Sequence, residues 1–150
     1  MLSCIYYLTK IEEQQGAIMA DKEFNQPLWN IPYYKKFNEQ LEQEVGDLLR
    51  TKTSVPKLYS NDLRHQYASA IYARNVGNDK AKFLGDLNEW TDFMGSGRYD
   101  TELDKINNEI GRGYGLANPN ITRSQLFDLL MADYQKNKGY SRAKLKDMGL

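Results

Sequence analysis

Apolar residues recur along this chain at the spacing of a helix face. In the first such segment they fall every three or four positions from Phe37 to Leu48, which predicts an amphipathic helix that ends near Arg50. Pro32 fits the first turn of that helix, because the amide hydrogen that a proline lacks has no partner there. The first helix predicted for the domain is therefore amphipathic.

Capping residues and glycines divide the rest of the chain. The N-cap types Ser60 and Asn61 open a second helix that closes at Gly77. The same signals predict helices between Asn78 and Gly95, between Thr101 and Gly111, and between Thr122 and Gly139, with a short turn from Ser141 to Lys146. No β-branched run alternates with period two. We therefore expect an all-α fold, a single compact domain of five or six short helices.

Length and composition fit one globular domain. The chain has 150 residues, 41% hydrophobic and 27% charged, and one core can hold a chain of this size. We expect residues 1–25 to form an N-terminal extension and residues 26–150 to form the helical domain with a basic C-terminal tail. Translation from Met19 is an alternative to Met1 and would remove Cys4. The extension lacks the features of a signal peptide, so secretion by that route is not expected.

Charge and cysteine content exclude several functions. Lys plus Arg and Asp plus Glu are 20 each, so the formal net charge is +0, which argues against a protein that coats nucleic acid or an anionic membrane. The basic tail is interpreted as a solvated helix face, with weak nucleic-acid contact as the alternative. With Cys4 and His65 as its only cysteine and histidine, the chain cannot form an internal disulfide or a Cys/His zinc site.

The second helix carries polar side chains where a core helix is expected to be apolar. Asp62, His65 and Ser69 share one face, next to the apolar face of Leu63 and Tyr67. A partly buried polar face must find hydrogen-bond partners. A carboxylate beside His65 is expected to raise the imidazole pKa and fix its tautomer, as in a general base.

Candidate partners follow on the next two predicted helices. They are Asp86 and Glu89 on the third helix and Asp104, Asn107, Asn108 and Arg112 on the fourth. In a catalytic interpretation His65 is the base and Glu89 and Asp104 are its acidic partners. In a structural interpretation these residues, with Asp62, Arg64 and Ser69, form a buried network that holds the helices in register. The sequence leaves both open.

Two weaker patterns are interpreted without a ligand. No cofactor is expected, and a divalent metal held by Glu89, Asp104 and Asn108 is the lesser alternative. The glycines at 111, 113 and 115 follow a predicted helix and are interpreted as a C-cap and a flexible turn, because a phosphate loop would precede a helix.

The order of these polar residues resembles an uncharacterised all-helical domain family of bacteriophage and bacterial effector-like proteins. The matching pattern is Asp62-Leu63-Arg64-His65, then Glu89, then the segment from Asp104 to Arg112, written D-x-x-R-H … E … D-x-x-N-N-x-x-G-R. Asn88 departs from the family, which often has a second histidine there. The resemblance implies a helical fold in a phage setting, located in the host bacterial cytoplasm or the virion.

Two functions are therefore expected as alternatives. The first is a small phage-type protein, virion-associated or host-interacting, that binds other proteins such as phage structural proteins, with Trp29, Tyr33 and Tyr34 as aromatic anchors. The second is a hydrolase acting on the bacterial cell envelope, with His65 as general base. Whether the chain is an enzyme is left open by the sequence.

Overall fold

The computed structural model describes residues 30–52, 57–92, 98–137 and 140–149, and their only regular elements are helices. These are α2 (Ile31–Lys52), α3 (Lys57–Val76), α4 (Asn78–Asp92), α5 (Arg98–Ala117), α6 (Arg123–Lys136) and α7 (Tyr140–Asp147). The predicted all-α class is thus confirmed.

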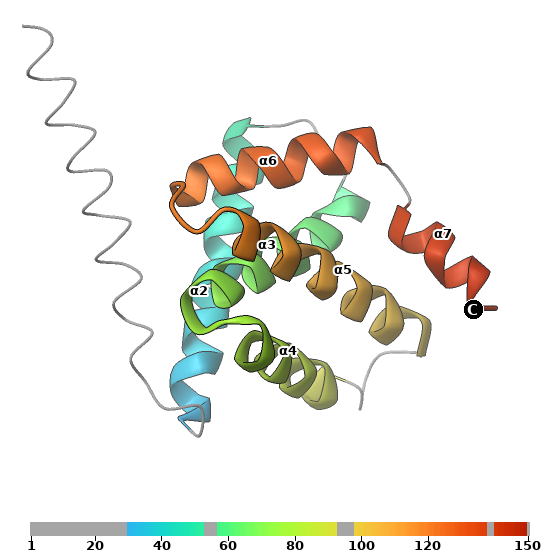
Figure 1. Ribbon diagram of the computed structural model, residues 1–150, viewed down its shortest axis with the longest axis horizontal. Helices are drawn as coiled ribbons and strands as arrows, with labels where there is room; N and C mark the ends of the chain where they lie inside the picture. Colours follow the sequence, from blue (N-terminus) through green and yellow to red (C-terminus); the bar gives the residue numbers. More distant parts are fainter. Residues whose placement is uncertain (1–29, 53–56, 93–97, 138–139, 150) are drawn as a thin grey trace, which may run out of the picture.

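Helix α3 lies at the centre of the molecule. It packs against α2, α4, α5 and α6, which surround it in Figure 1. Its apolar face, formed by Leu63, Tyr67, Ala70 and Ile71, is completely buried. Burial of such side chains is the main driving force for folding, at about 1.5–3 kcal/mol for a large aliphatic one. Because α3 is covered on several sides, its polar face is buried as well.

Helix α2 follows the predicted stripe. Phe37, Leu41 and Val45 are buried against the core, and Pro32 lies in the first turn. Tyr34 is also buried, and its ring lies beside those of Tyr33 and Tyr72. The expectation that Tyr34 is a surface anchor is therefore wrong. Trp29 lies outside the described residues.

The predicted boundaries of two helices were wrong. Helix α3 begins at Lys57, so Ser60 and Asn61 lie inside it instead of capping it. Helix α5 begins at Arg98 and continues through Gly111, Gly113 and Gly115 to Ala117. These glycines are therefore part of a helix and do not form a flexible turn. Packing against α3, described below, outweighs their low helix propensity.

The predicted start of α6 is confirmed in atomic detail. Thr122 and Gln125 form a capping box, in which each side chain accepts a hydrogen bond from the backbone amide of the other. A half-buried carboxylate ties this helix to two others: Glu44 of α2 accepts hydrogen bonds from the Tyr67 hydroxyl and from Arg123. The start of α6 is thus fixed onto the α2–α3 pair.

Helix α7 covers a second, smaller apolar cluster. Leu145 is completely buried with Leu103 and Ile106 of α5, and Ile110 packs at the edge of this cluster. In Figure 1, α7 lies beside the N-terminal half of α5. Within the described ranges, no helix has both the length and the apolar character that crossing a membrane requires.

Candidate functional site: a buried polar network between α3 and α5

Two glycines bring the backbones of α3 and α5 unusually close. A Cβ atom on Gly111 would lie 2.7 Å from the carbonyl carbon of Gln66, and one on Gly115 would lie 2.8 Å from that of Ala70. Real Cβ atoms do not approach a backbone so closely, so only glycine fits at either position. Asn107 and Asn108 lie one turn before Gly111, where even short side chains can reach across to α3.

His65 is held between two side chains of α5. Its Nε2 atom lies 3.2 Å from Oδ1 of Asp104, and its Nδ1 atom lies 3.3 Å from Oδ1 of Asn108. The hydroxyl of Ser69 donates to the same Asn108 oxygen at 2.8 Å. His65 is 7% exposed, and Ser69 and Asn108 are buried with it. We call these four residues the His65 group.

Asn107 links three helices in a second, adjoining group. Its Oδ1 atom accepts hydrogen bonds from Gln66 Nε2 and from the hydroxyl of Ser141, both at 2.9 Å. Its Nδ2 atom donates to Oδ1 of Asp62 at 3.1 Å, and the Tyr134 hydroxyl donates to the other oxygen of Asp62. Asn107 is completely buried. We call these five residues the Asn107 group; they tie α3 and α5 to α6 and α7.

Burial keeps His65 neutral. Removal of the ring from water lowers the pKa of His65 to about 4, and the nearby charge of Arg64 acts in the same direction. The predicted increase in pKa is therefore wrong, because lost hydration and the charge of Arg64 outweigh the hydrogen bond to Asn108. The predicted role of a carboxylate in fixing the tautomer fits the geometry, since Asp104 favours the N–H on Nε2. At neutral pH the ring thus acts as a hydrogen-bonding group without charge.

We expect the low pKa of His65 to make folding sensitive to mild acid. Between pH 6.5 and about 4 the unfolded chain binds a proton at this ring and the folded chain does not, so the free energy of unfolding falls as pH falls. The loss should reach up to about 3 kcal/mol. Urea unfolding across this range, compared between the natural chain and His65→Gln, measures it. Parallel pH profiles of the two proteins would contradict a depressed His65 pKa.

Not every residue expected at this site belongs to it. Asp86 is exposed and pairs with Lys82 on its own helix. It points away because the part of α4 that approaches Asn108 is Gly85, where an added Cβ would lie 3.3 Å from the Asn108 amide nitrogen. The side chain of Glu89 lies outside the described residues, so its role as an acidic partner stays a prediction.

Two arginines expected at the site differ in position. Arg64 lies at its edge, where it pairs with Glu42 at 3.2 Å and donates to Asn61, which in turn lies 3.4 Å from Asp104. Arg112 makes no bond to either group within the described part of the chain, and its buried Nε atom has no hydrogen-bond partner there. The predicted role of Arg112 as a donor to the site is therefore wrong.

Three members of the Asn107 group were not identified from the sequence. Gln66 completes the stripe of Asp62 and Ser69 at spacings of four and three, a signal that the sequence does contain. Tyr134 and Ser141 come from distant segments, α6 and α7, and reach the site only through the fold. No local pattern marks them as partners of Asp62 or Asn107.

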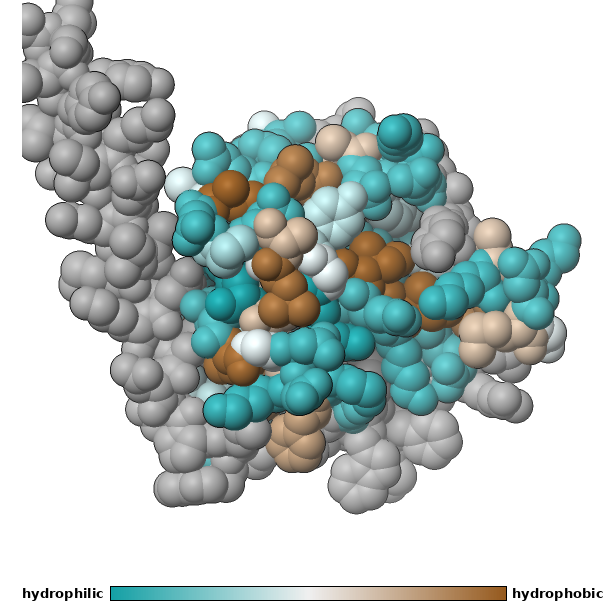
Figure 2. Space-filling model, in the orientation of Figure 1, coloured by the Kyte–Doolittle hydropathy of each residue, from teal (hydrophilic) through white to brown (hydrophobic). Residues whose placement is uncertain are grey.

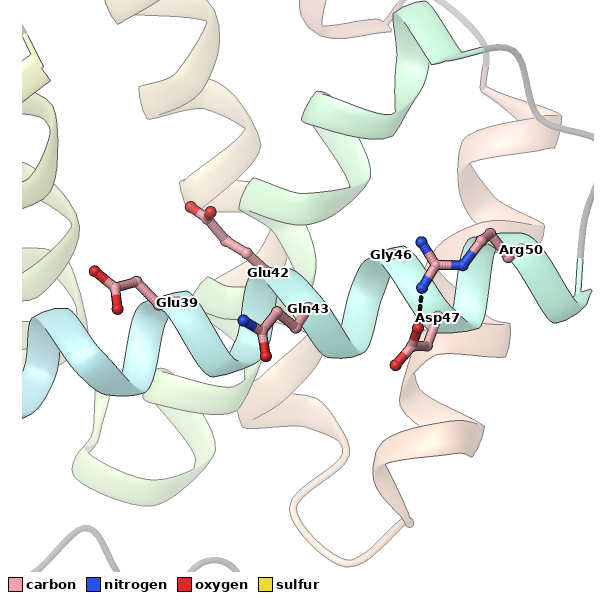
Figure 3. Close-up of a pocket in the computed structure, with 6 residues that line it drawn as sticks. All are labelled: Glu39, Glu42, Gln43, Gly46, Asp47 and Arg50. Atoms are coloured by element: carbon pink, nitrogen blue, oxygen red, sulfur yellow. Dashed lines mark hydrogen bonds and ion pairs between the residues drawn. The ribbon is translucent and has the colours of Figure 1, made fainter.

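Two open hollows lie elsewhere on the surface. One, of about 620 Å³, follows the outer face of α2 and is lined by Glu39, Glu42, Gln43, Gly46, Asp47 and Arg50. Figure 3 shows its acidic side chains along one helix, with Arg50 paired to Asp47. The other, of about 390 Å³, lies on α5 beside α7. Neither is lined by a member of the His65 group.

A metal site is not apparent in the part of the chain that is described. No cluster of three or more His, Cys, Asp or Glu side chains is found there. The weaker prediction of a divalent metal depends on Glu89, whose side chain lies outside that part, so it stays a prediction. What the geometry offers is a hydrogen-bonded contact between helices.

No protein-family model, no curated protein and no solved structure matches this chain. Its function must therefore be inferred from its own residues.

Proposed function

We propose that this protein acts by binding other proteins through its surface, and that the polar network beneath that surface holds its helices in register. The observation that carries this proposal is the burial of His65: both ring nitrogens face side chains of α5, and the ring is 7% exposed. A general base must come within hydrogen-bond reach of its substrate. Because the ring of His65 is buried and both its nitrogens face α5, a structural role for His65 is favoured over a catalytic one. The setting proposed for this binding is a phage particle or an infected bacterial cell, on the strength of the sequence resemblance.

Exposed apolar side chains support the proposal. Large hydrophobic residues are exposed on three helices and near the C-terminus: Phe83, Leu116, Leu129 and Met148. Removal of such side chains from water by a partner lowers the free energy of the complex. Interface centres are enriched in aromatic residues and methionine. These four side chains are 41–54% exposed, which leaves a large part of each available for contact.

Replacement of exposed apolar residues should weaken partner binding without unfolding the protein. We expect Phe83→Asp or Leu129→Asp to lower recovery of a co-purifying protein about tenfold, the effect of about 1.4 kcal/mol at a contact. A tagged full chain, produced in its natural host or isolated from purified particles, is compared by quantitative mass spectrometry. His65→Gln, in which the surface is unchanged, is the matched control and should keep the partner wherever it remains folded. Recovery of the natural chain and of His65→Gln without any partner would contradict the proposal.

The hydrolase alternative has one observation in its favour, the contact between His65 Nε2 and Asp104. Under this alternative the natural chain hydrolyses cell-envelope material, and His65→Gln remains folded but does not. Circular dichroism of the same sample reports folding. Loss of hydrolysis with the helical signal intact would favour this alternative over surface binding, whereas absence of hydrolysis in the natural chain would exclude it.

A further inference from the structure

The outer side of α5 carries an open apolar groove, which we call the α5 groove. It is lined by Ile106, Glu109, Ile110, Gly113, Tyr114, Ala117 and Asn118 of α5 and its end, and by Lys144 of α7. Figure 2 shows apolar residues gathered along α5 beside α7 on this face of the molecule. The α5 groove is therefore formed by one face of α5, and α7 contributes only Lys144 to its lining.

The α5 groove continues an existing contact between helices. Helix α7 already covers the neighbouring part of α5, where Leu145 is buried against Leu103 and Ile106. Ile106 belongs both to that covered cluster and to the open groove, and Ile110 borders both. The apolar surface of α5 thus continues from the part that α7 covers into an exposed part. The covered part already packs against the face of a helix.

The middle of the groove is shaped for close approach. Gly113 is exposed, and a Cβ built on it would have no atom within 4 Å. A glycine inside a helix is disfavoured relative to alanine, and no contact among the described residues requires one here. On another side of the same helix, Gly111 and Gly115 admit the backbone of α3. Gly113 and Ala117 leave similar room for a helix from outside.

The charges at the rim favour a second copy of this chain as the occupant. The rim carries one acid and one base, Glu109 and Lys144, whose charged atoms lie 3.6 Å apart. Two identical rims facing each other therefore have no net repulsion, and each acid can pair with the base of the other copy. The hollow on α2 differs, because Glu39, Glu42 and Asp47 outnumber Arg50 there and two copies would repel each other.

We propose that two copies of this chain associate through the α5 groove, with α5 of one copy packed against α5 of the other about a two-fold axis. Such an interface is self-complementary, as a symmetric dimer requires. The pair would bury Ile110 and Ala117 of both copies and would bring their Gly113 residues close together. This inference goes beyond the proposed function, which a monomer could also perform.

Analytical ultracentrifugation of the full chain tests the proposal, in reducing buffer so that Cys4 cannot crosslink. We expect the mass to rise from monomer to dimer with protein concentration up to about 0.1 mM, in the range of specific association. Gly113→Gln should weaken the dimer at least tenfold, because its side chain occupies the space that a second helix needs. It should leave the monomer folded, because that position is open to solvent. Ala132→Gln, which places the same side chain at an exposed position of α6, is the matched control and should leave the dimer unchanged.

Three results would overturn the proposal. A chain that stays monomeric over the whole concentration range does not pair through this groove. A dimer that Ala132→Gln weakens and Gly113→Gln does not uses another face. A monomer whose groove is shielded by a different protein, detected as protection of α5 amides in hydrogen exchange with that protein present, has a different occupant. Because partner recovery in the binding experiment is measured with Phe83 and Leu129 variants, failure of the dimer leaves that result unaffected.

Discussion

Alanine at Gly111 or Gly115 is expected to destabilise the protein severely, whereas alanine at Gly113, in the same helix, is expected to stabilise it. The methyl group at the first two positions would overlap the backbone of α3 at Gln66 and Ala70. A backbone cannot turn aside as a flexible side chain can, so the two helices must separate. We expect each substitution to cost at least about 3 kcal/mol, the upper range for an overpacked core.

The loss should exceed the effect of one misplaced methyl group, because the polar network depends on the same close approach. Asn107 and Asn108 reach Gln66 and Ser69 across the gap at 2.9 and 2.8 Å. Hydrogen bonds weaken steeply when donor and acceptor are pulled beyond about 3.5 Å. Separation of α3 from α5 would therefore leave buried amide and hydroxyl groups without partners, each at a cost of about 1–3 kcal/mol.

Gly113→Ala is the matched control, because it adds the same methyl group in an exposed position with no atom within 4 Å. It should raise the free energy of unfolding by about 1 kcal/mol, the difference between glycine and alanine inside a helix. Urea unfolding at low protein concentration, followed by circular dichroism, measures all three variants. Equal stabilities for Gly111→Ala and Gly113→Ala would contradict the close packing of α3 and α5.

The contrast among these glycines shows why the sequence predicted the fold class but not the full length of α5. Apolar spacing and capping signals are local, and they correctly predicted an all-α chain and the capping box at Thr122. A glycine, however, has low helix propensity wherever it occurs, so local reasoning placed the end of a helix before Gly111. What keeps Gly111 and Gly115 helical is contact with α3, which is distant in sequence.

The candidate site could be predicted only in part, because local patterns identify its polar residues but not how deeply the fold buries them. Asp62, His65 and Ser69 were identifiable as polar residues on a central helix, and Asp104, Asn107 and Asn108 as their partners on another. These pairings depend on helix periodicity, which the sequence displays. The depth of burial, which lowers the pKa of His65 rather than raising it, depends on how many helices cover α3. No pattern within α3 itself carries that information.

Asn107→Asp is expected to have the second large effect, although it changes only one group of the side chain. The new carboxylate would lie about where the Asn107 amide now donates to Asp62, so two acidic groups would face each other in a completely buried position. Two ionised carboxylates cannot share such a site without a large penalty. We expect a loss of about 3–5 kcal/mol at pH 7, as when a buried charged group loses its partner.

The dependence of this loss on pH separates charge from shape. Like charge raises the folded-state pKa of the new acidic pair, so the folded variant binds a proton more readily than the unfolded chain does. Its deficit relative to the natural chain should therefore shrink as pH falls from 7 toward 5. The effect of His65 is common to both proteins and cancels in this comparison. Asn120→Asp, the same change at an exposed position, is the control and should change stability by less than about 0.5 kcal/mol. The Asn107 oxygen that accepts a hydrogen bond from Ser141 is kept in Asn107→Asp, so the variant should lose stability chiefly through charge. A deficit that stays constant between pH 7 and pH 5 would mean instead that Asp62 and Asn107 are not in contact.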